Sequence, residues 1–303
     1  MRGRLDRRTF VGLSVAAALT PPSVFAAAGT DPDLVAFLSD MHVGGGKSGD
    51  RQAKRLADAV DAVLAMRPRP ANCIVAGDIA KGIGAKGDYV RAKAQFDRLE
   101  AAGVAVTFAM GNHDRRDTFA EVFPKAWAAT AVPGRLVSLV ETPHAGFLVL
   151  DTLGQNPDPT KSGLAFEYTD GQHAFLKRTV EGREKPLIVI AHNALEDGRF
   201  RKCVFRAPCI RGFIHGHEHA WFRRVWRGIG PDGRYAGLRA LSLPSTGDWG
   251  DIGWASMRLT ADTATVTLHQ ADYWFPEPGK PSAAECAAFV GENAGSSCVF
   301  FLK

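Results

Sequence analysis

Five apolar stretches of this chain each end in a short polar motif that contains histidine, aspartate or asparagine. The motifs are Asp40-Met41-His42, Gly77-Asp78, Gly111-Asn112-His113-Asp114, His192 and Gly216-His217-Glu218-His219. Each apolar stretch has the length and composition of a buried strand. An open α/β sheet places its chemistry in the turns that follow its central strands. We therefore expect a sheet that gathers these five motifs at one edge.

Strands and helices are expected to alternate through the first part of the chain. The pattern predicts strands at 34–38, 73–76 and 104–109 and helices at 51–66 and 88–102. The first helix has Leu56, Val60 and Val63 on one side and stops before Pro68. This alternation implies right-handed crossovers and a parallel sheet.

After the third motif the pattern changes to shorter elements. A hairpin is predicted from 136–140 and 146–150, followed by a polar loop over 154–169 and a helix to Val180 that Asp170 caps. Strands over 187–191 and 210–214 lead into the last two motifs, and four more are expected at 220–226, 235–243, 255–259 and 264–269. Periodicity alone thus predicts a mixed α/β fold that is rich in strands towards its end.

In this order the motifs resemble those of the calcineurin-like metallophosphoesterases, from about Val35 to His219 and weakly beyond. The resemblance implies an α/β fold, a four-layer α/β/β/α sandwich of two mixed sheets flanked by helices. It also implies two divalent metal ions. Mixed carboxylate, imidazole and amide ligands suit Mn, Fe or Zn rather than Ca, which prefers oxygen alone.

The resemblance also assigns ligands to the two ions. The first ion would be held by Asp40, His42 and His219, the second by Asn112, His192 and His217, and Asp78 would bridge them. His217 and His219 point to the same side of an extended segment, as joint ligation requires. The remaining histidines are interpreted as surface residues (His144, His173), as a core residue or one that backs the site (His215), and as structural (His269).

Two further residues are expected to act on the substrate. The resemblance places His113 beside the scissile ester, where it would protonate the leaving oxygen or stabilise phosphoryl charge, and an imidazole suits this work. Arg116 is interpreted as a substrate-binding residue that meets a phosphate, with a solvated ion pair as the alternative.

Departures from the family's branches narrow the expected activity. Ile79-Ala80-Lys81-Gly82 follows Asp78, which removes the second Asp of serine/threonine phosphatases and the Tyr of purple acid phosphatases. Arg116 stands where 5′-nucleotidases carry an Asp. Gly111–Arg116, followed by Phe119 and Phe123, resembles the class III cyclic-nucleotide phosphodiesterases, although Asn193-Ala194-Leu195 after His192 departs from that branch.

The expected function is thus metal-dependent hydrolysis of small phosphoesters, most similar to that of a phosphodiesterase. A hydroxide held between the two ions would attack phosphorus, and His113 would assist the leaving group. The alternatives are a phosphomonoesterase and an enzyme acting on a polymer or lipid headgroup. A non-catalytic binding module is disfavoured, because all seven ligand positions are filled.

The N-terminus resembles a twin-arginine signal peptide. Arg7-Arg8-Thr9-Phe10-Val11 precedes a short apolar stretch and small residues up to Ala28. We expect cleavage near Ala26 or Ala28, export by the twin-arginine machinery to the periplasm or medium, and no stable membrane span afterwards, because the apolar stretch is too short.

Charge argues against a nucleic-acid partner. Residues 1–28 hold four Arg and one Asp, so the remaining chain has 33 Lys and Arg against 31 Asp and Glu. A balance this close to neutral does not favour nucleic acid. A small phosphoester is the expected partner, and the sequence does not predict the oligomeric state.

The predicted organisation is a signal peptide (1–28), a metallophosphoesterase domain (29–276) and a tail (277–303). In an oxidising compartment, disulfides are plausible between Cys286 and Cys298, which would close the tail, and between Cys203 and Cys209. Cys73 is interpreted as a buried free thiol.

Overall fold

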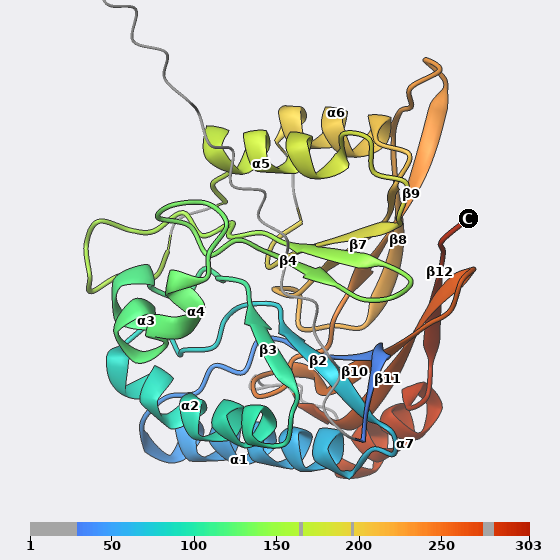
Figure 1. Ribbon diagram of the computed structural model, residues 1–303. Helices are drawn as coiled ribbons and strands as arrows, with labels where there is room; N and C mark the ends of the chain where they lie inside the picture. Colours follow the sequence, from blue (N-terminus) through green and yellow to red (C-terminus); the bar gives the residue numbers. More distant parts are fainter. Residues whose placement is uncertain (1–28, 164–165, 195–196, 275–281) are drawn as a thin grey trace, which may run out of the picture.

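Two six-stranded sheets lie face to face in the computed structural model, which describes residues 29–163, 166–194, 197–274 and 282–303. Helices cover the outer face of each sheet, so the layers run helix, sheet, sheet, helix (Figure 1). The strand order is β12-β11-β10-β1-β2-β3 in the first sheet and β4-β5-β6-β7-β9-β8 in the second. Because each sheet contains parallel and antiparallel pairs, the predicted sandwich of two mixed sheets is confirmed.

The first sheet is built from both ends of the described chain. Its strands are β1 (Thr30–Leu38), β2 (Arg69–Val75), β3 (Ala105–Phe108), β10 (Gly250–Leu259), β11 (Thr263–Trp274) and β12 (Ser297–Phe301). β1, β2 and β3 are parallel, as the alternation predicted, and are connected by α1 (Gly46–Ala65) and α2 (Lys86–Ala101). β10, β11 and β12 extend the sheet as antiparallel strands on the other side of β1.

The second sheet begins with the predicted hairpin, β4 (Ser138–Glu141) and β5 (Gly146–Val149). It continues through β6 (Leu187–Ala191), β7 (Ile210–His215), β8 (Phe222–Ile229) and β9 (Tyr235–Ser242). The outer layer of this sheet is formed by α5 (Asp170–Val180) and α6 (Gly198–Arg206).

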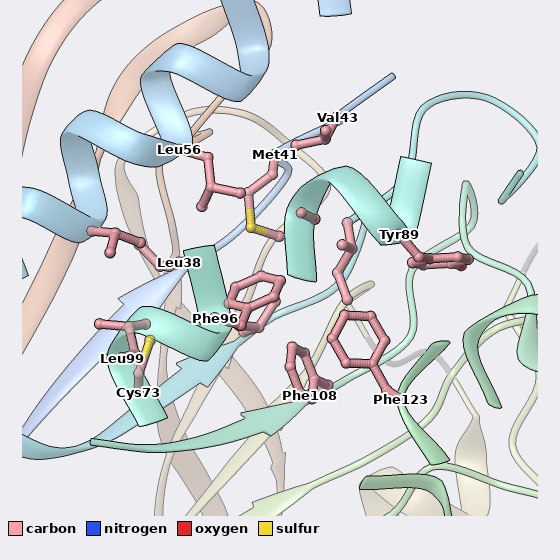
Figure 2. Close-up of a cluster of buried hydrophobic side chains, with 14 of the residues drawn as sticks. Leu38, Met41, Val43, Leu56, Cys73, Tyr89, Phe96, Leu99, Phe108 and Phe123 are labelled. Carbon is pink, nitrogen blue, oxygen red and sulfur yellow. The ribbon is translucent and has the colours of Figure 1, made fainter. Parts of the chain in front are cut away.

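Adjacent residues of β1 belong to different hydrophobic cores, because side chains alternate across a strand. Leu38 belongs to the cluster between the first sheet and α1 and α2, shown in Figure 2, whereas Phe37 belongs to the cluster between the two sheets. In the first cluster Phe96 meets Phe108 edge to face, with ring centroids 5.0 Å apart. A third cluster lies between the second sheet and its helices.

Several elements differ from the sequence-based expectation. Thr169, and not Asp170, caps α5, because its side-chain oxygen accepts a hydrogen bond from the Gln172 N–H. The pattern did not predict α3 (Arg116–Val122), α4 (Pro124–Ala128), α6, α7 (Ala283–Asn293) or β12. The residues after the predicted boundary at 276 therefore include a strand of the first sheet.

Neither predicted disulfide is formed in the structure. Cys203 and Cys209 are both free thiols, and burial raises the pKa of each. Cys298 is also a thiol and lies in the cluster between the sheets, whereas Cys286 belongs to α7 in the outer helical layer (Figure 1). The two residues thus lie on different sides of the first sheet. Cys73 is a buried thiol, as predicted.

The predicted signal peptide, residues 1–28, lies outside the described residues. Within the part of the chain that the structure describes, no helix has both the length and the apolar character needed to cross a bilayer.

Candidate metal centre

The five polar motifs follow the carboxyl ends of β1, β2, β3, β6 and β7. β1, β2 and β3 run parallel to one another in the first sheet, and β6 and β7 run parallel in the second. The motifs of each sheet therefore lie at the same end of that sheet, where its parallel strands have their carboxyl ends. The side chains from the two sheets meet there. All of the residues predicted to hold metals are brought together at this place.

One group of donors consists of Asp40, His42 and His219. Their ligand atoms all lie within 4.8 Å of one another. The His219 Nε2 is 3.2 Å from the Asp40 Oδ1 and 3.2 Å from the His42 Nε2. All three residues are buried. This is the group predicted for the first ion.

A second group consists of Asp78, His192 and His217, whose ligand atoms also lie within 4.8 Å of one another. The Asn112 Oδ1 is 3.1 Å from the His192 Nε2 and so belongs beside this group. The Asp78 Oδ2 lies 3.2 Å from the His192 Nε2 and 3.6 Å from the His42 Nε2. Asp78 thus stands between the two groups, where a bridging carboxylate was predicted.

Five residues of the two donor groups have a left-handed backbone conformation, which is strained for a residue with a side chain. No other non-glycine residue in the described part of the chain has a positive φ angle. Positive φ angles occur at five positions, namely Asp40 (53°), His42 (46°), Asp78 (51°), His217 (71°) and His219 (51°). The left-handed region costs roughly 1–2 kcal/mol for a residue with a Cβ atom. Such strain persists where the surroundings enforce it, and it concentrates at functional sites.

Hydrogen bonds between motifs hold this conformation. The Asp40 N–H donates to the Gly77 carbonyl (3.1 Å), and the His42 N–H donates to the Asp78 carbonyl (3.0 Å). The His217 N–H donates to both Asp40 carboxylate oxygens, at 3.1 and 3.0 Å. Each motif is therefore fixed by its neighbour and not by its own sequence alone.

Two glycines of the motifs are required by this close approach. A Cβ atom on Gly111 would lie 2.1 Å from the Asp78 Oδ1, and one on Gly216 would lie 2.6 Å from the Asp40 Oδ2. Both distances are far inside van der Waals contact. The glycines thus leave room for the carboxylates that the site uses.

Backbone carbonyls orient three of the imidazoles. The Nδ1 atoms of His192, His219 and His113 lie 2.9, 3.0 and 2.9 Å from the carbonyl oxygens of Ala76, Trp249 and Gly82, respectively. Each Nδ1–H therefore donates to a carbonyl and directs the Nε2 atom of its ring away from that carbonyl. For His192 and His219 this arrangement is typical of histidines that ligate metals.

The carboxylates of the site are ionised, which is the form that binds cations. Burial alone would raise the pKa of the Asp40 carboxyl, but the imidazoles of His219 and His192 hold it well below its usual range. The pKa of Asp78 is lowered in the same way by His192 and His42. Burial opposes a charge on His192, yet Asp78 and Asp40 raise its pKa to about 10.

Asp114 is a structural centre of the site that the sequence analysis did not identify. Its Oδ1 accepts hydrogen bonds from the N–H groups of Ile79 and Ala80 and from the Tyr89 hydroxyl, each at 3.1 Å. Its Oδ2 accepts from the Gly111 N–H at 2.9 Å. Burial and the neighbouring Asp78 raise its pKa to about 7. Asp114 therefore ties the turn after β3 to the turn after β2.

His113 lies beside both donor groups, and its ligand atom is within 4.8 Å of those of His42 and Asp78. Its ring packs edge to face on that of His42, with centroids 5.0 Å apart, and its backbone N–H donates to the Asp78 Oδ1 at 2.8 Å. The Ser162 hydroxyl donates to the same Gly82 carbonyl that accepts from the His113 ring. The polar loop after residue 154 therefore supports the carbonyl that orients His113.

The Arg116 side chain forms an ion pair with Asp151. Its Nε and Nη2 atoms donate to the two carboxylate oxygens of Asp151, each at 2.7 Å, and Nη2 also donates to the Leu153 carbonyl at 2.5 Å. The Asp151 side chain is fully buried, and that of Arg116 is 12% exposed. A substrate-binding role for Arg116 stays a prediction.

The other histidines lie outside the two donor groups. His215 is buried, hydrogen-bonds the Gly216 carbonyl and has its pKa lowered to about 4 by burial. His269 stacks on Trp254, and His173 lies beside Tyr168. Trp249, by contrast, belongs to the site, because its ring stacks on His219 at a centroid distance of 4.3 Å and is partly exposed.

The donor set fits two divalent transition-metal ions. It combines two carboxylates, four imidazoles and one amide oxygen, arranged as two groups with Asp78 between them. Sets of this kind suit Mn, Fe and Zn and do not choose among them. The ionised carboxylates and the orientation of His192 and His219 agree with this fit.

The fold and the site define a metal-dependent phosphoester hydrolase. Residues 34–221 match the family model of the calcineurin-like phosphoesterases, and the chain belongs to this family, which depends on two metal ions. The chain is also similar to a probable cyclic nucleotide phosphodiesterase of Rhodopseudomonas palustris, with 28% identity over 197 residues, covering 58% of this chain and 67% of that protein.

Solved structures with similar folds are more distant. A 5′-nucleotidase precursor from Thermus thermophilus has 16% identity and a TM-score of 0.44, and the match covers 75% of this chain. It spans about half of the Thermus chain (51%). The zinc complex of wild-type Vps29 from Entamoeba histolytica has 11% identity and a TM-score of 0.39, covering 89% of this chain and 99% of that chain.

Proposed function

We propose that this hydrolase cleaves small phosphodiesters. The observation that carries the proposal is the ion pair between Arg116 and Asp151. A monoester dianion would need more cationic contacts than a singly charged diester, and the Arg116 guanidinium is already occupied. The similarity to a probable cyclic nucleotide phosphodiesterase supports the same choice.

The proposal assigns the following metal ligands. Asp40, His42 and His219 would hold one ion, Asn112, His192 and His217 the other, and Asp78 would be shared. When bound, the ions would supply an activated water and neutralise charge on the phosphoryl oxygens.

His113 would carry a proton to the leaving oxygen. The Gly82 carbonyl fixes its Nδ1–H, so its Nε2 is the atom that is left to face a substrate. Positioned proton transfer of this kind contributes about 10²–10⁴-fold to rate. Asp114 and Ser162 act only through the turns that they hold.

The test compares hydrolysis of bis-p-nitrophenyl phosphate with that of p-nitrophenyl phosphate by the Mn-reconstituted protein. The proposal predicts a higher kcat/KM for the diester, and its loss in His217→Ala. His144→Ala, which changes a histidine outside the site, serves as the matched control and keeps the activity. A higher kcat/KM for the monoester would contradict the proposal.

We also propose that the enzyme acts outside the cytoplasm. The support is the pattern Arg7-Arg8-Thr9-Phe10-Val11 and the apolar stretch after it. In a twin-arginine-competent bacterium, the wild-type chain should appear in the periplasm or medium, and the Arg7→Lys/Arg8→Lys variant should stay in the cytoplasm. Equal export of both would refute this route.

A further inference from the structure

The hairpin formed by β8 and β9 has one covered and one uncovered face. On the covered face Trp226 packs on Phe213, with ring centroids 4.5 Å apart, and a Cβ atom on Gly228 would lie 2.3 Å from the ring of Phe205 on α6. On the opposite face Val225, Ile229 and Tyr235 are 61%, 44% and 86% exposed.

The uncovered face is a continuation of the layer between the two sheets. Arg239 marks the end of that layer, since its Nη1 donates to the Val299 carbonyl at 2.7 Å and its guanidinium lies over the Phe301 ring at 4.6 Å. Phe301 belongs to β12, the edge strand of the first sheet, and is 55% exposed. Beyond this edge the hairpin extends past β12 (Figure 1, upper right).

We call this surface the open face. Strand register places its members side by side, because Val225 pairs with Arg239 and Ile229 pairs with Tyr235. Its residues are Arg223, Val225, Arg227, Ile229, Tyr235, Arg239 and Phe301. It thus combines four exposed apolar side chains with three arginines and contains no acidic residue.

The hairpin as a whole has the same sign of charge. Residues 222–239 hold five Arg and no Lys against one Asp, although the chain after residue 28 is nearly neutral. Arg234, in the turn of the hairpin, is largely exposed, and the exposed Asp232 is 3.9 Å from it. A surface whose charges are mostly of one sign attracts a partner of opposite charge.

A second copy of the chain does not suit the open face. β8 is the edge strand of the second sheet, so two copies would pair their β8 strands in antiparallel fashion about a two-fold axis. An axis through Val225 would place Arg223 of one copy opposite Arg227 of the other, and like charges in opposite positions are destabilising. The occupant should therefore be anionic.

We propose that the open face docks on a lipid bilayer that carries anionic headgroups. Exposed aliphatic and aromatic side chains enter the headgroup region of a bilayer, while arginines bind the lipid phosphates. The face is spread over two strands and their turn, as contact with a planar partner requires. This inference is independent of the diester preference proposed above.

Docking in this way would leave the metal centre accessible. β8 begins at Phe222, three residues after His219, and runs away from the site to Ile229. Seven residues of extended strand span roughly 23 Å. The tip that contacts lipid is thus at the far end of the hairpin from the metal ligands.

The experiment is flotation of the metal-loaded full chain with phosphatidylcholine vesicles, with and without phosphatidylglycerol. Binding is expected only with phosphatidylglycerol and should decrease as salt increases. Arg227→Gln/Arg234→Gln should weaken it by roughly fivefold for each arginine. Val225→Ser/Tyr235→Ser should weaken it by roughly tenfold.

The matched control is Lys202→Gln/Arg206→Gln, which removes two exposed charges from α6 on the other side of the sheet. It should change binding by less than about twofold, since its charges do not face the membrane. Each variant should keep the wild-type melting temperature and diester hydrolysis, which separates loss of docking from loss of folding.

Four results would overturn the proposal. The first is no binding of the wild-type chain to anionic vesicles, and the second is an equal loss in the α6 control. The third is a dimer in solution that Val225→Ser/Tyr235→Ser dissociates, because the open face would then be a self-interface. The fourth is binding to polyglutamate but not to vesicles, because the partner would then be an acidic protein.

Discussion

Asp114 connects two of the site's turns through a single buried carboxylate. Three backbone N–H groups and one hydroxyl donate hydrogen bonds to it. These donors belong to buried residues, so they would have no water to bond if the carboxylate were removed. Unsatisfied buried donors are costly, so Asp114→Ala should lower the free energy of unfolding by about 3 kcal/mol. Urea unfolding of the metal-free protein measures this loss without the contribution of metal binding.

Asp117→Ala is the control for Asp114→Ala. Asp117 lies three residues away, its carboxylate is more than half exposed, and it pairs with Arg115. Surface pairs contribute about 0–1 kcal/mol, so this variant should remain close to the wild type. If Asp114→Ala were as stable as Asp117→Ala, the carboxylate would not organise the two turns.

Arg116 offers a test between a structural and a substrate-binding role. Removing it leaves the Asp151 carboxylate buried without its cation, which costs about 3–5 kcal/mol of stability. We therefore expect Arg116→Ala to melt well below wild type, while Arg115→Ala, whose partner is exposed, changes little. A stable Arg116→Ala variant with a greatly raised KM would instead show that Arg116 binds substrate.

The difference between predicted and observed roles at the residue scale has a physical origin. The ligand-type residues could be recognised because their chemistry and order are visible in the sequence. The hydrogen-bonding roles of Asp114 and Asp151 could not, because the role of a buried carboxylate is defined by the donors around it, and those donors come from distant turns. The buried partner of Arg116 could not be predicted for the same reason, since Asp151 lies 35 residues away in sequence.

At the element scale, the cap of α5 provides a direct comparison of neighbouring residues. Thr169→Ala removes the oxygen that accepts from the Gln172 N–H and should cost about 1 kcal/mol of stability. Asp170→Ala, which removes the residue expected to cap the helix, should cost a few tenths of a kcal/mol, because its side chain is 94% exposed. Thermal unfolding of the two variants measures both losses of stability. A larger loss for Asp170→Ala than for Thr169→Ala would show that Asp170 is the cap.

Elements with a strong apolar period could be predicted closely. β6 has the expected bounds, Leu187–Ala191, because all five residues are buried and apolar. α6 was not predicted, because four of its nine residues are basic and only one side is buried, by Phe200, Val204 and Phe205. β12 was not predicted, because Cys298 and Phe300 become core residues only when β11 is beside them.

At the scale of the whole molecule, the arrangement in two sheets was predicted from the resemblance to the calcineurin-like metallophosphoesterases. The periodicity of apolar residues alone predicted only a mixed α/β fold. The order of β10, β11 and β12 beside β1 depends on contacts between the two ends of the chain. The open face is likewise a property of the assembled sheets, since it exists because β8 and β9 extend past β12. No local pattern encodes either feature.

The whole molecule is organised around two groups of donors that could hold two metal ions, with Asp78 between the groups, and the number of ions can be measured directly. After reconstitution with Mn or Zn and removal of free metal, elemental analysis should find about two ions per chain. Asp78→Asn should retain fewer than one, because both groups lose the shared carboxylate, while Asp117→Asn should keep two. A single ion in the wild-type protein, or two in Asp78→Asn, would contradict this account.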